Sequence, residues 1–170
     1  MAEDDYPNTD RARWVAVEEA AELIHEERYL EALGALRDAL RADPANGYAY
    51  FFTGVALFEC GQLEGARDAY RACLRVSPRH LGARVALCHV LRKLGSHREA
   101  IAAGVAALEQ APADGDALYA VGMAHWARGD LPAAERYLSA FLRAGPEFEV
   151  KVEVESILAR IASQTPDRNN

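Results

Sequence analysis

Cysteine is scarce in this sequence: Cys60, Cys73 and Cys88 are the only three in 170 residues. An odd number of widely separated cysteines fits neither a disulfide framework nor a paired-cysteine metal site, so we interpret them as buried or partly buried thiols. The five histidines are equally scattered. His25-Glu26 resembles half of a zinc-protease motif, but Tyr29 stands where the second histidine should be. We therefore expect no metal and no cofactor.

Basic residues and long apolar runs are also few. The chain has 19 Lys and Arg against 26 Asp and Glu, a formal net charge of -7, and no basic stripe that could bind a phosphate backbone. No apolar run approaches the roughly 18 residues of a membrane span. Residues 1–10 are acidic and lack the basic and apolar regions of a secretory signal. We expect a cytoplasmic protein with no nucleic-acid partner and no membrane insertion.

Motifs that carry enzyme chemistry are missing as well. The sequence contains no nucleophile elbow, no phosphate-binding loop and no complete zinc-protease motif. Its five serines fall in expected linkers or on expected helix surfaces, without an evident base nearby. The sequence therefore predicts a protein that is not an enzyme.

The sequence has instead a strict internal repeat in an alanine-rich, 51% hydrophobic background, which favours helices. Prolines recur at a constant spacing of 34 residues, and four other columns repeat with them without any gap. With the proline as position 32, the repeats begin at Arg13, Gly47, Leu81 and Gly115. The columns are Pro44, Pro78, Pro112 and Pro146 (position 32); Ala20, Gly54, Cys88 and Gly122 (position 8); Ala32, Ala66, Ala100 and Ala134 (position 20); Leu40, Leu74, Leu108 and Leu142 (position 28); and Glu27, Gly61, Gly95 and Gly129 (position 15).

Each column has a physical role in a pair of helices. Small residues at positions 8 and 20 allow the two helices to cross closely. Glycine at position 15 can end the first helix in the left-handed conformation. The next residue can cap the second helix, for which Ser96 and Asp130 are good and Gln62 and Arg28 poor. The proline at position 32 then closes the second helix.

This pattern resembles the tetratricopeptide repeat, a 34-residue helix-turn-helix unit, over Arg13 to Pro146. The resemblance implies an all-α fold: a right-handed superhelix, or α-α solenoid, of four helical hairpins plus a C-terminal capping helix. A single apolar stripe, Val150, Val154, Ile157, Leu158 and Ile161, favours the capping helix. The expected segments are a disordered N-terminus at 1–10, repeats at 11–46, 47–80, 81–114 and 115–146, the capping helix at 147–163 and a disordered tail at 164–170. The expected helices of the repeats are 11–26, 29–42, 47–60, 63–76, 81–94, 97–110, 115–128 and 131–144.

In a stack of such hairpins the first helices line a concave face with positions 2, 5, 9 and 12. Here these positions and one neighbour are largely aromatic and apolar, with a basic spot at Arg92 and Lys93. A solvated face would carry charge, so we predict a groove that binds an extended or helical segment of a partner protein through apolar anchors. Arg92 would attract an acidic group on the ligand. The predicted groove residues are Trp14, Tyr48, Phe51, Phe52, Val55, Phe58, Val85, His89, Arg92, Tyr119, Met123 and Trp126.

The favoured function is therefore a non-catalytic scaffold or adaptor, and two alternatives stay open. The aromatic residues could instead pack between helices or against the N-terminal segment of the same chain. The chain also resembles, more weakly, the tetratricopeptide chaperones of bacterial type III secretion, which hold a hydrophobic translocator. The carboxylate clamp for Hsp70 and Hsp90 is not expected, because its positions hold Val17, Ala21, Gly82 and Ala86.

Overall fold

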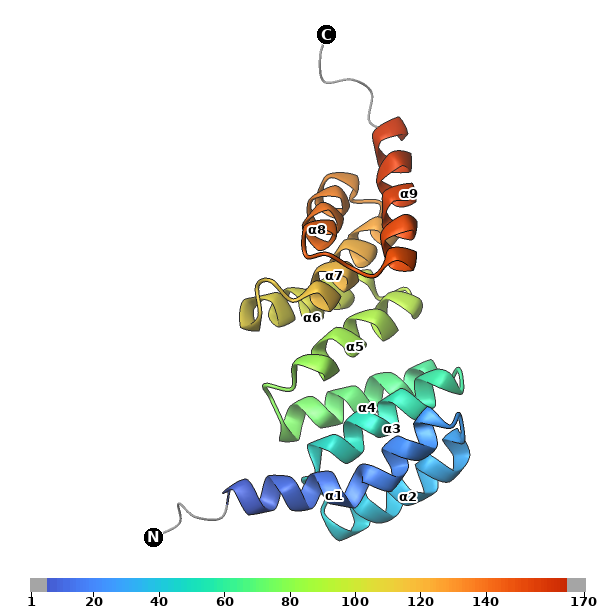
Figure 1. The fold of residues 1–170 in the computed structure, drawn as a ribbon, viewed down its shortest axis with the longest axis vertical. Coiled ribbons are helices and arrows are strands. Elements are labelled where there is room, and N and C mark those ends of the chain that lie inside the picture. Colours follow the sequence, from blue (N-terminus) through green and yellow to red (C-terminus); the bar gives the residue numbers. More distant parts are fainter. Residues whose placement is uncertain (1–5, 165–170) are drawn as a thin grey trace. The chain divides into compact units, whose positions relative to one another are not determined.

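The computed structural model describes residues 6–164, and that part of the chain consists of helices joined by short turns (Figure 1). The helices are α1 (Tyr6–His25), α2 (Tyr29–Ala42), α3 (Gly47–Glu59), α4 (Leu63–Val76), α5 (Leu81–Lys93), α6 (His97–Gln110), α7 (Gly115–Arg128), α8 (Leu131–Arg143) and α9 (Phe148–Gln164). Apart from the start of α1, their bounds agree with the expected ranges to within one residue. None of these helices has the length and apolarity needed to cross a membrane.

The start of the first helix was predicted wrongly. Residues 6–10 are helical, although the sequence analysis assigned 1–10 to a disordered segment. Pro7 is the second residue of α1, where a missing N–H costs little, so it does not stop the helix. Asp10 is held by the hydroxyl of Tyr48, which donates to its carboxylate at 3.1 Å. The other stretches predicted to be disordered, 1–5 and 165–170, lie outside the described residues.

The turn inside each hairpin follows the predicted geometry. Gly61, Gly95 and Gly129 have φ of 74°, 76° and 83°, and Glu27 takes the same left-handed conformation with φ of 61°. The next backbone N–H donates to the carbonyl five residues earlier, as Arg28 does to Leu23 at 2.8 Å. This turn supplies hydrogen-bond donors to carbonyl groups that the end of the helix would otherwise leave unpaired. The prediction for position 15 is confirmed in all four repeats.

The helix caps lie elsewhere than predicted. Ser96 and Asp130 make no side-chain cap hydrogen bond, because the preceding left-handed turn gives them a backbone conformation unlike that of an extended N-cap residue. The Asp130 carboxylate instead lies 3.0 Å from Nδ1 of His125. The side chains that cap helices occupy position 34, and each accepts from the N–H of the alanine at position 3 of the next repeat. These pairs are Asn46 with Ala49 (3.2 Å), His80 with Ala83 (3.1 Å) and Asp114 with Ala117 (2.8 Å).

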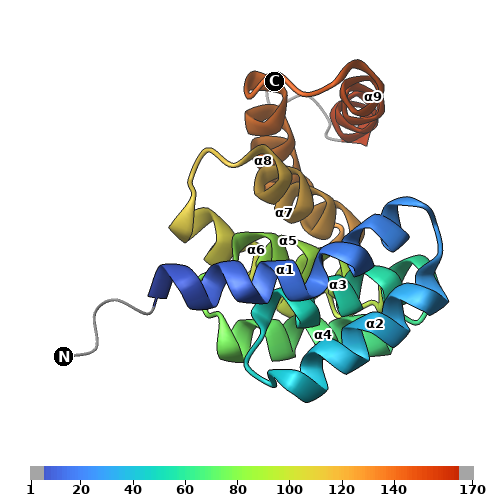
Figure 2. The same ribbon diagram turned by 60° about the horizontal axis from the view of Figure 1, so that its bottom comes forward.

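The chain divides into two compact units, an N-terminal unit up to Ala86 and a C-terminal unit from Leu87. In the N-terminal unit α1, α2 and α3 pack on one another, and α3 packs on α4 (Figure 2). The buried residues at the junction of α1, α2 and α3 are Val17, Ala20, Leu36, Ala39 and Ala49. A Cβ atom on Gly54 would lie 2.4 Å from the ring of Tyr70. Position 8 must therefore be small where α3 crosses α4, as predicted.

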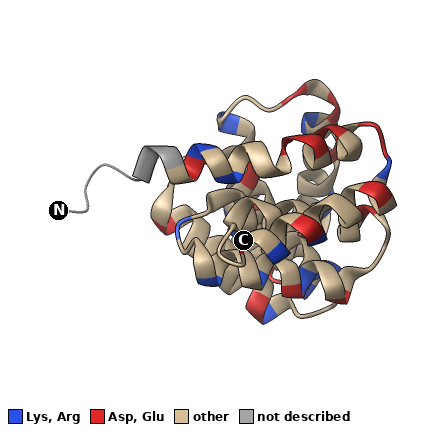
Figure 3. Cartoon of the chain, turned by 90° about the horizontal axis from the view of Figure 1, so that it is seen from below, with Lys and Arg blue, Asp and Glu red and all other residues tan. Residues whose placement is uncertain are grey.

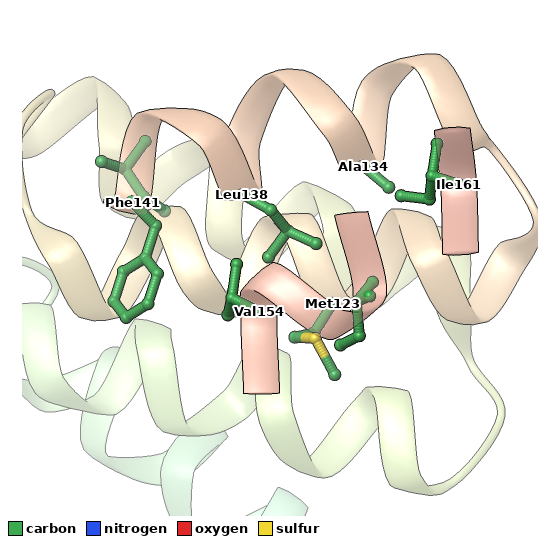
Figure 4. Packing of buried hydrophobic residues seen from close by; sticks show 8 residues of the cluster. Met123, Ala134, Leu138, Phe141, Val154 and Ile161 are labelled. Carbon is green, nitrogen blue, oxygen red and sulfur yellow. The ribbon is translucent and has the colours of Figure 1, made fainter. Parts of the chain in front are cut away.

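In the C-terminal unit α6 packs on α7, α7 on α8, and α9 on α8. The stripe predicted for the capping helix is turned inward: Val154, Ile157 and Ile161 are buried, and Val150 and Leu158 pack beside them. Figure 4 shows Val154 and Ile161 of α9 among Met123 of α7 and Leu138 of α8. The helix α9 thus closes the apolar face of the last hairpin, as expected of a capping helix.

The three cysteines are free thiols, with Cys73 and Cys88 buried and Cys60 partly exposed. Burial raises the pKa of Cys73 to about 11 and that of Cys88 to about 12. Both thiols therefore stay protonated near neutral pH and behave as small apolar side chains.

Candidate functional site

Aromatic side chains of α1 and α3 gather in the N-terminal unit. Trp14 lies edge-on to Tyr48, with ring centroids 5.5 Å apart, and 6.0 Å from Phe52. Phe52 is in turn 5.4 Å from Phe51. These contacts match the preferred separations of aromatic pairs, so the rings hold one another in place. All four are predicted groove residues, and the structure brings them together.

A fifth ring, that of His80, completes this group, which we call the N-terminal aromatic cluster (Trp14, Tyr48, Phe51, Phe52 and His80). His80 lies 4.7 Å from Phe51 and 6.3 Å from Tyr48. Burial lowers the pKa of His80, and its Nδ1 accepts the Ala83 N–H, which requires an unprotonated nitrogen there. The cluster is only partly covered: 41% of the Trp14 surface is exposed, and the side chains of Tyr48, Phe51 and Phe52 are half-buried.

A pocket of about 630 Å³ adjoins this cluster, and we call it the N-terminal pocket. Its walls are Asp10, Arg13, Gly47, Tyr48, Ser77, Pro78, Arg79 and His80. The guanidinium of Arg13 donates to Asp43 at 2.7 Å, and this bond is the main reason that the pKa of Asp43 is lowered. The Arg13 carbonyl accepts the Asn46 side-chain amide at 2.9 Å. Arg13 is thus fixed from both ends.

Sequence reasoning missed the polar residues of this pocket. Arg79 and His80 occupy positions 33 and 34, in the link between repeats, whereas the predicted groove was confined to the first helix of each hairpin. Asp10 belongs to the segment that was predicted to be disordered. The signal that could have found His80 is its repeat position 34, which it shares with Asn46 and Asp114, both usual N-cap residues. The predicted residues Val55 and Phe58 are half-buried farther along α3.

A second group of rings lies in the C-terminal unit. His89 of α5 is 5.9 Å from Tyr119 of α7, and Tyr119 is 5.3 Å from Phe141 of α8. The Tyr119 hydroxyl donates to Glu153 of α9 at 3.4 Å. These rings border a pocket of about 600 Å³, the C-terminal pocket, whose walls are His89, Gly115, Asp116, Tyr119, Phe141, Ala144, Gly145, Pro146, Glu147 and Val150. The predicted residues His89 and Tyr119 therefore share one site.

Two predicted groove residues are core residues in the structure. Met123 is only 8% exposed because α9 covers this face of α7, and Val85 is 8% exposed as well. Trp126 packs against the same buried cluster, with the Arg160 guanidinium of α9 5.2 Å from its ring centre. Arg92 is half-buried, and its Nε has no hydrogen-bond partner. The capping helix therefore occupies part of the surface that was predicted to bind a ligand.

Basic and acidic residues are interspersed along the helices in the part of the chain that is drawn in full (Figure 3). Within residues 6–164 no group of three or more His, Cys, Asp or Glu side chains is arranged to hold a metal ion. The pockets thus present aromatic rings and a few fixed charges, which suit recognition of a ligand.

Comparison with known proteins also identifies a helical repeat in this chain. A family model described as "Tetratricopeptide repeat" matches residues 17–79 and 85–147, whereas no curated protein matches the sequence. Among solved structures, MamA 41-end from Desulfovibrio magneticus RS-1 has a TM-score of 0.73 at 20% identity, covering 89% of this chain and 92% of that one. PilW, a widely conserved type IV pilus biogenesis factor, has a TM-score of 0.78 at 23% identity, covering 90% and 70%.

A third solved structure is the first TPR of Spaghetti (RPAP3) bound to the HSP90 peptide SRMEEVD. It has a TM-score of 0.63 at 20% identity, covering 68% of this chain and 93% of that one. At such identities these likenesses show the fold. The family model covers more than half of the sequence, and the helices, turns and packing columns agree with it. The chain belongs to the tetratricopeptide repeat family.

Proposed function

We propose that this chain is a non-catalytic adaptor whose N-terminal aromatic cluster binds a peptide segment of a partner protein. Tetratricopeptide repeat proteins are in general scaffolds for protein–protein interaction. The observation that carries the proposal is the half-covered group of mutually packed rings at Trp14, Tyr48, Phe51 and Phe52. Rings that already contact one another lose little freedom when a ligand covers them, so they make efficient anchors.

The expected affinity is moderate. Covering a large apolar side chain contributes about 1.5–3 kcal/mol, so three or four such anchors contribute up to about 12 kcal/mol, from which the cost of ordering a peptide is subtracted. A net binding free energy of about 8 kcal/mol corresponds to a micromolar Kd. That affinity suits an adaptor that exchanges its partners.

The N-terminal pocket supplies polar groups beside these anchors. Arg13 is held by its bond to Asp43, and the Tyr48 hydroxyl is held by Asp10. Fixed polar groups at the edge of an apolar surface set the direction and register of a ligand. We therefore expect the bound segment to combine apolar anchors with a polar end near Arg13.

Selection from a library of random dodecapeptides displayed on phage tests this proposal, followed by calorimetric titration of the selected peptides. Trp14→Ala should weaken binding at least about tenfold, roughly 1.4 kcal/mol, because it removes an exposed anchor. The matched control is Leu30→Ala on α2, where 77% of the side chain is exposed but no ring cluster lies. Unchanged binding by Trp14→Ala, or an equal loss in the control, would contradict the proposal.

A melting curve separates binding from stability. Trp14→Ala removes two ring contacts of about 0.5–1.5 kcal/mol each, so a modest fall in melting temperature is expected while the chain stays folded. A large fall in melting temperature would show that Trp14 is a core residue. The chaperone role and the cytoplasmic location stay predictions from the sequence.

A further inference from the structure

The N-terminal and C-terminal pockets are built from the same repeat positions. Positions 1 and 2 supply Gly47 and Tyr48 to the first pocket, and Gly115 and Asp116 to the second. The link at positions 32 and 33 supplies Pro78 and Arg79 to the first. In the second pocket the same positions supply Pro146 and Glu147. Each pocket therefore forms where the start of a first helix meets the link that closes the same repeat.

Equivalent positions differ in charge between the two pockets. Position 33 is Arg79 in one and Glu147 in the other, and position 2 is Tyr48 in one and Asp116 in the other. The N-terminal pocket has two arginines and one carboxylate in its walls, whereas the C-terminal pocket has two carboxylates and no Lys or Arg. The same repeat positions thus form two pockets whose walls differ in charge.

The aromatic walls of the C-terminal pocket suit a cation. Tyr119 and Phe141 lie 5.3 Å apart, and His89 lies 5.9 Å from Tyr119. The face of an aromatic ring attracts a cation, and nearby carboxylates add their own Coulomb attraction. Burial and the nearby Arg92 lower the pKa of His89, so its ring is mostly neutral at pH 7 and does not repel a cation.

The surrounding charges leave this pocket negative. Glu153, which accepts the Tyr119 hydroxyl, adds a third carboxylate to those of Asp116 and Glu147. Against them stand Arg92, which acts on both His89 and Tyr119, Lys93, which acts on His89, and the N-termini of α7 and α9, each equivalent to about half a positive charge. These positive charges are about equal to the three carboxylates. The Asp114 carboxylate, which caps α7, is a fourth negative charge and leaves the surroundings of the pocket negative.

We propose that the C-terminal pocket binds a cationic group, a guanidinium or an ammonium, between its aromatic rings and the carboxylates of Asp116 and Glu147. The group belongs either to an arginine or lysine side chain of a bound peptide or to a free organic amine. An anion would meet two carboxylates in the walls, and a purely apolar group would gain no attraction from either of them. This site is independent of the aromatic cluster in the N-terminal unit.

The test is an NMR titration of the full ¹⁵N-labelled chain with blocked amino acids. Nα-acetyl-arginine methylamide should give saturable shifts at the amides of residues 115–119 and of Gly145 and Glu147. The matched probes are the norleucine derivative, which keeps the length without the charge, and the glutamate derivative, which reverses the charge. Neither should bind there. Absence of saturation with arginine, or equal shifts with norleucine, would overturn the proposal.

A variant with the charge reversed at position 33 gives a second test of the cation-binding pocket. Glu147 is exposed and lies in the link between α8 and α9, so Glu147→Arg should fold normally. It should weaken arginine binding at least about tenfold, a difference of roughly 1.4 kcal/mol. Glu109→Gln, at an exposed site on α6 away from the pocket, is the control and should bind as the wild type does. Undiminished binding by Glu147→Arg would overturn the proposal.

Two further probes identify the source of the cation. Butylguanidinium carries the charge alone, and the blocked peptide Ala-Ala-Arg-Ala-Ala carries it on a backbone. Tighter binding of the peptide supports a protein partner, and equal binding supports a free amine. Either result supports the cationic site. Loss of binding of the selected dodecapeptides in Trp14→Ala, with arginine binding to this pocket intact, would confirm that the two sites are separate.

Discussion

Glu27 occupies the one position-15 site in which a residue other than glycine takes the left-handed conformation. Its φ of 61° matches the values of 74° to 83° at the three glycines of this column. A side chain in this conformation costs about 1–2 kcal/mol, whereas glycine adopts it freely but loses more chain entropy on folding. We predict that Glu27→Gly raises the free energy of unfolding by up to about 1 kcal/mol, measured by urea denaturation.

The reverse change is the control for this prediction. Gly61 has a φ of 74° and no atom within 4 Å of an added Cβ, so Gly61→Ala would introduce backbone strain without a steric clash. Its free energy of unfolding should fall by about 1 kcal/mol. If both variants lost stability, the cost of the left-handed backbone would not decide which residue is favoured at position 15.

His80 makes the stability of the N-terminal unit depend on pH. Its Nδ1 must be unprotonated to accept the Ala83 N–H, and burial lowers its pKa from the ordinary value of 6.5. The unfolded chain therefore takes up a proton at a higher pH than the folded one does. Stability is full above about pH 6.5 and falls as the pH drops toward the pKa of the folded state.

This pH dependence predicts the behaviour of a matched variant. His80→Asn keeps a side-chain acceptor, as Asn46 does at the same repeat position, but does not titrate. The loss of stability between pH 7.5 and pH 5.5, measured by urea denaturation, should be smaller in this variant than in the wild type. Part of the loss should persist, because the pKa of His89 is lowered in the same direction. Equal losses would show that the cap does not titrate.

Sequence alone predicted the glycine turns but not the caps, for a physical reason. A left-handed turn depends on one residue, so a column of glycines identifies it directly. A cap depends on where the helix begins, and histidine at position 34 is not a usual N-cap residue. Asn46 and Asp114 at the same position were the available signal.

The crossing of the two helices in a hairpin depends on paired volumes at positions 8 and 24. Gly54 faces Tyr70 and Gly122 faces Leu138, whereas Cys88 faces Gly104, whose added Cβ would lie 3.1 Å from the Cys88 sulfur. A small residue on one helix thus accompanies a larger one on the other, with the roles exchanged in the third repeat. This exchange explains why Cys88 is accepted in a column of otherwise smaller residues.

Two glycines in neighbouring helices of the N-terminal unit test this packing. Gly54→Ala would put a Cβ 2.4 Å from the ring of Tyr70, and we expect it to lower the free energy of unfolding by about 1–3 kcal/mol. Gly34 in α2 has nothing within 4 Å of an added Cβ, so Gly34→Ala should raise it by about 1 kcal/mol through helix propensity. Thermal unfolding followed by circular dichroism measures both. A gain in Gly54→Ala would refute close packing at position 8.

For the molecule as a whole, the repeat made the fold predictable and left the binding surface uncertain. Gap-free columns identify every hairpin, because each column reflects a contact within the hairpin or with its neighbour. The exposure of a groove residue depends instead on what covers it. Met123 and Trp126 were predicted to be accessible, but the apolar stripe of α9 packs against their face of α7. The sequence showed that stripe without showing which surface it would cover.

That covering helix is also what completes the last hairpin. Ile157 of α9 is 7% exposed within the cluster that contains Leu138 and Phe141 of α8, so Ile157→Ala should leave a cavity and lower the free energy of unfolding by about 2–5 kcal/mol. Val152 on the same helix is 47% exposed, so Val152→Ala should change it by less than about 0.5 kcal/mol. Urea denaturation measures both. If Ile157→Ala changed the free energy of unfolding as little as Val152→Ala does, α9 would contribute little to stability. The apolar face of α7 would then be open to a partner.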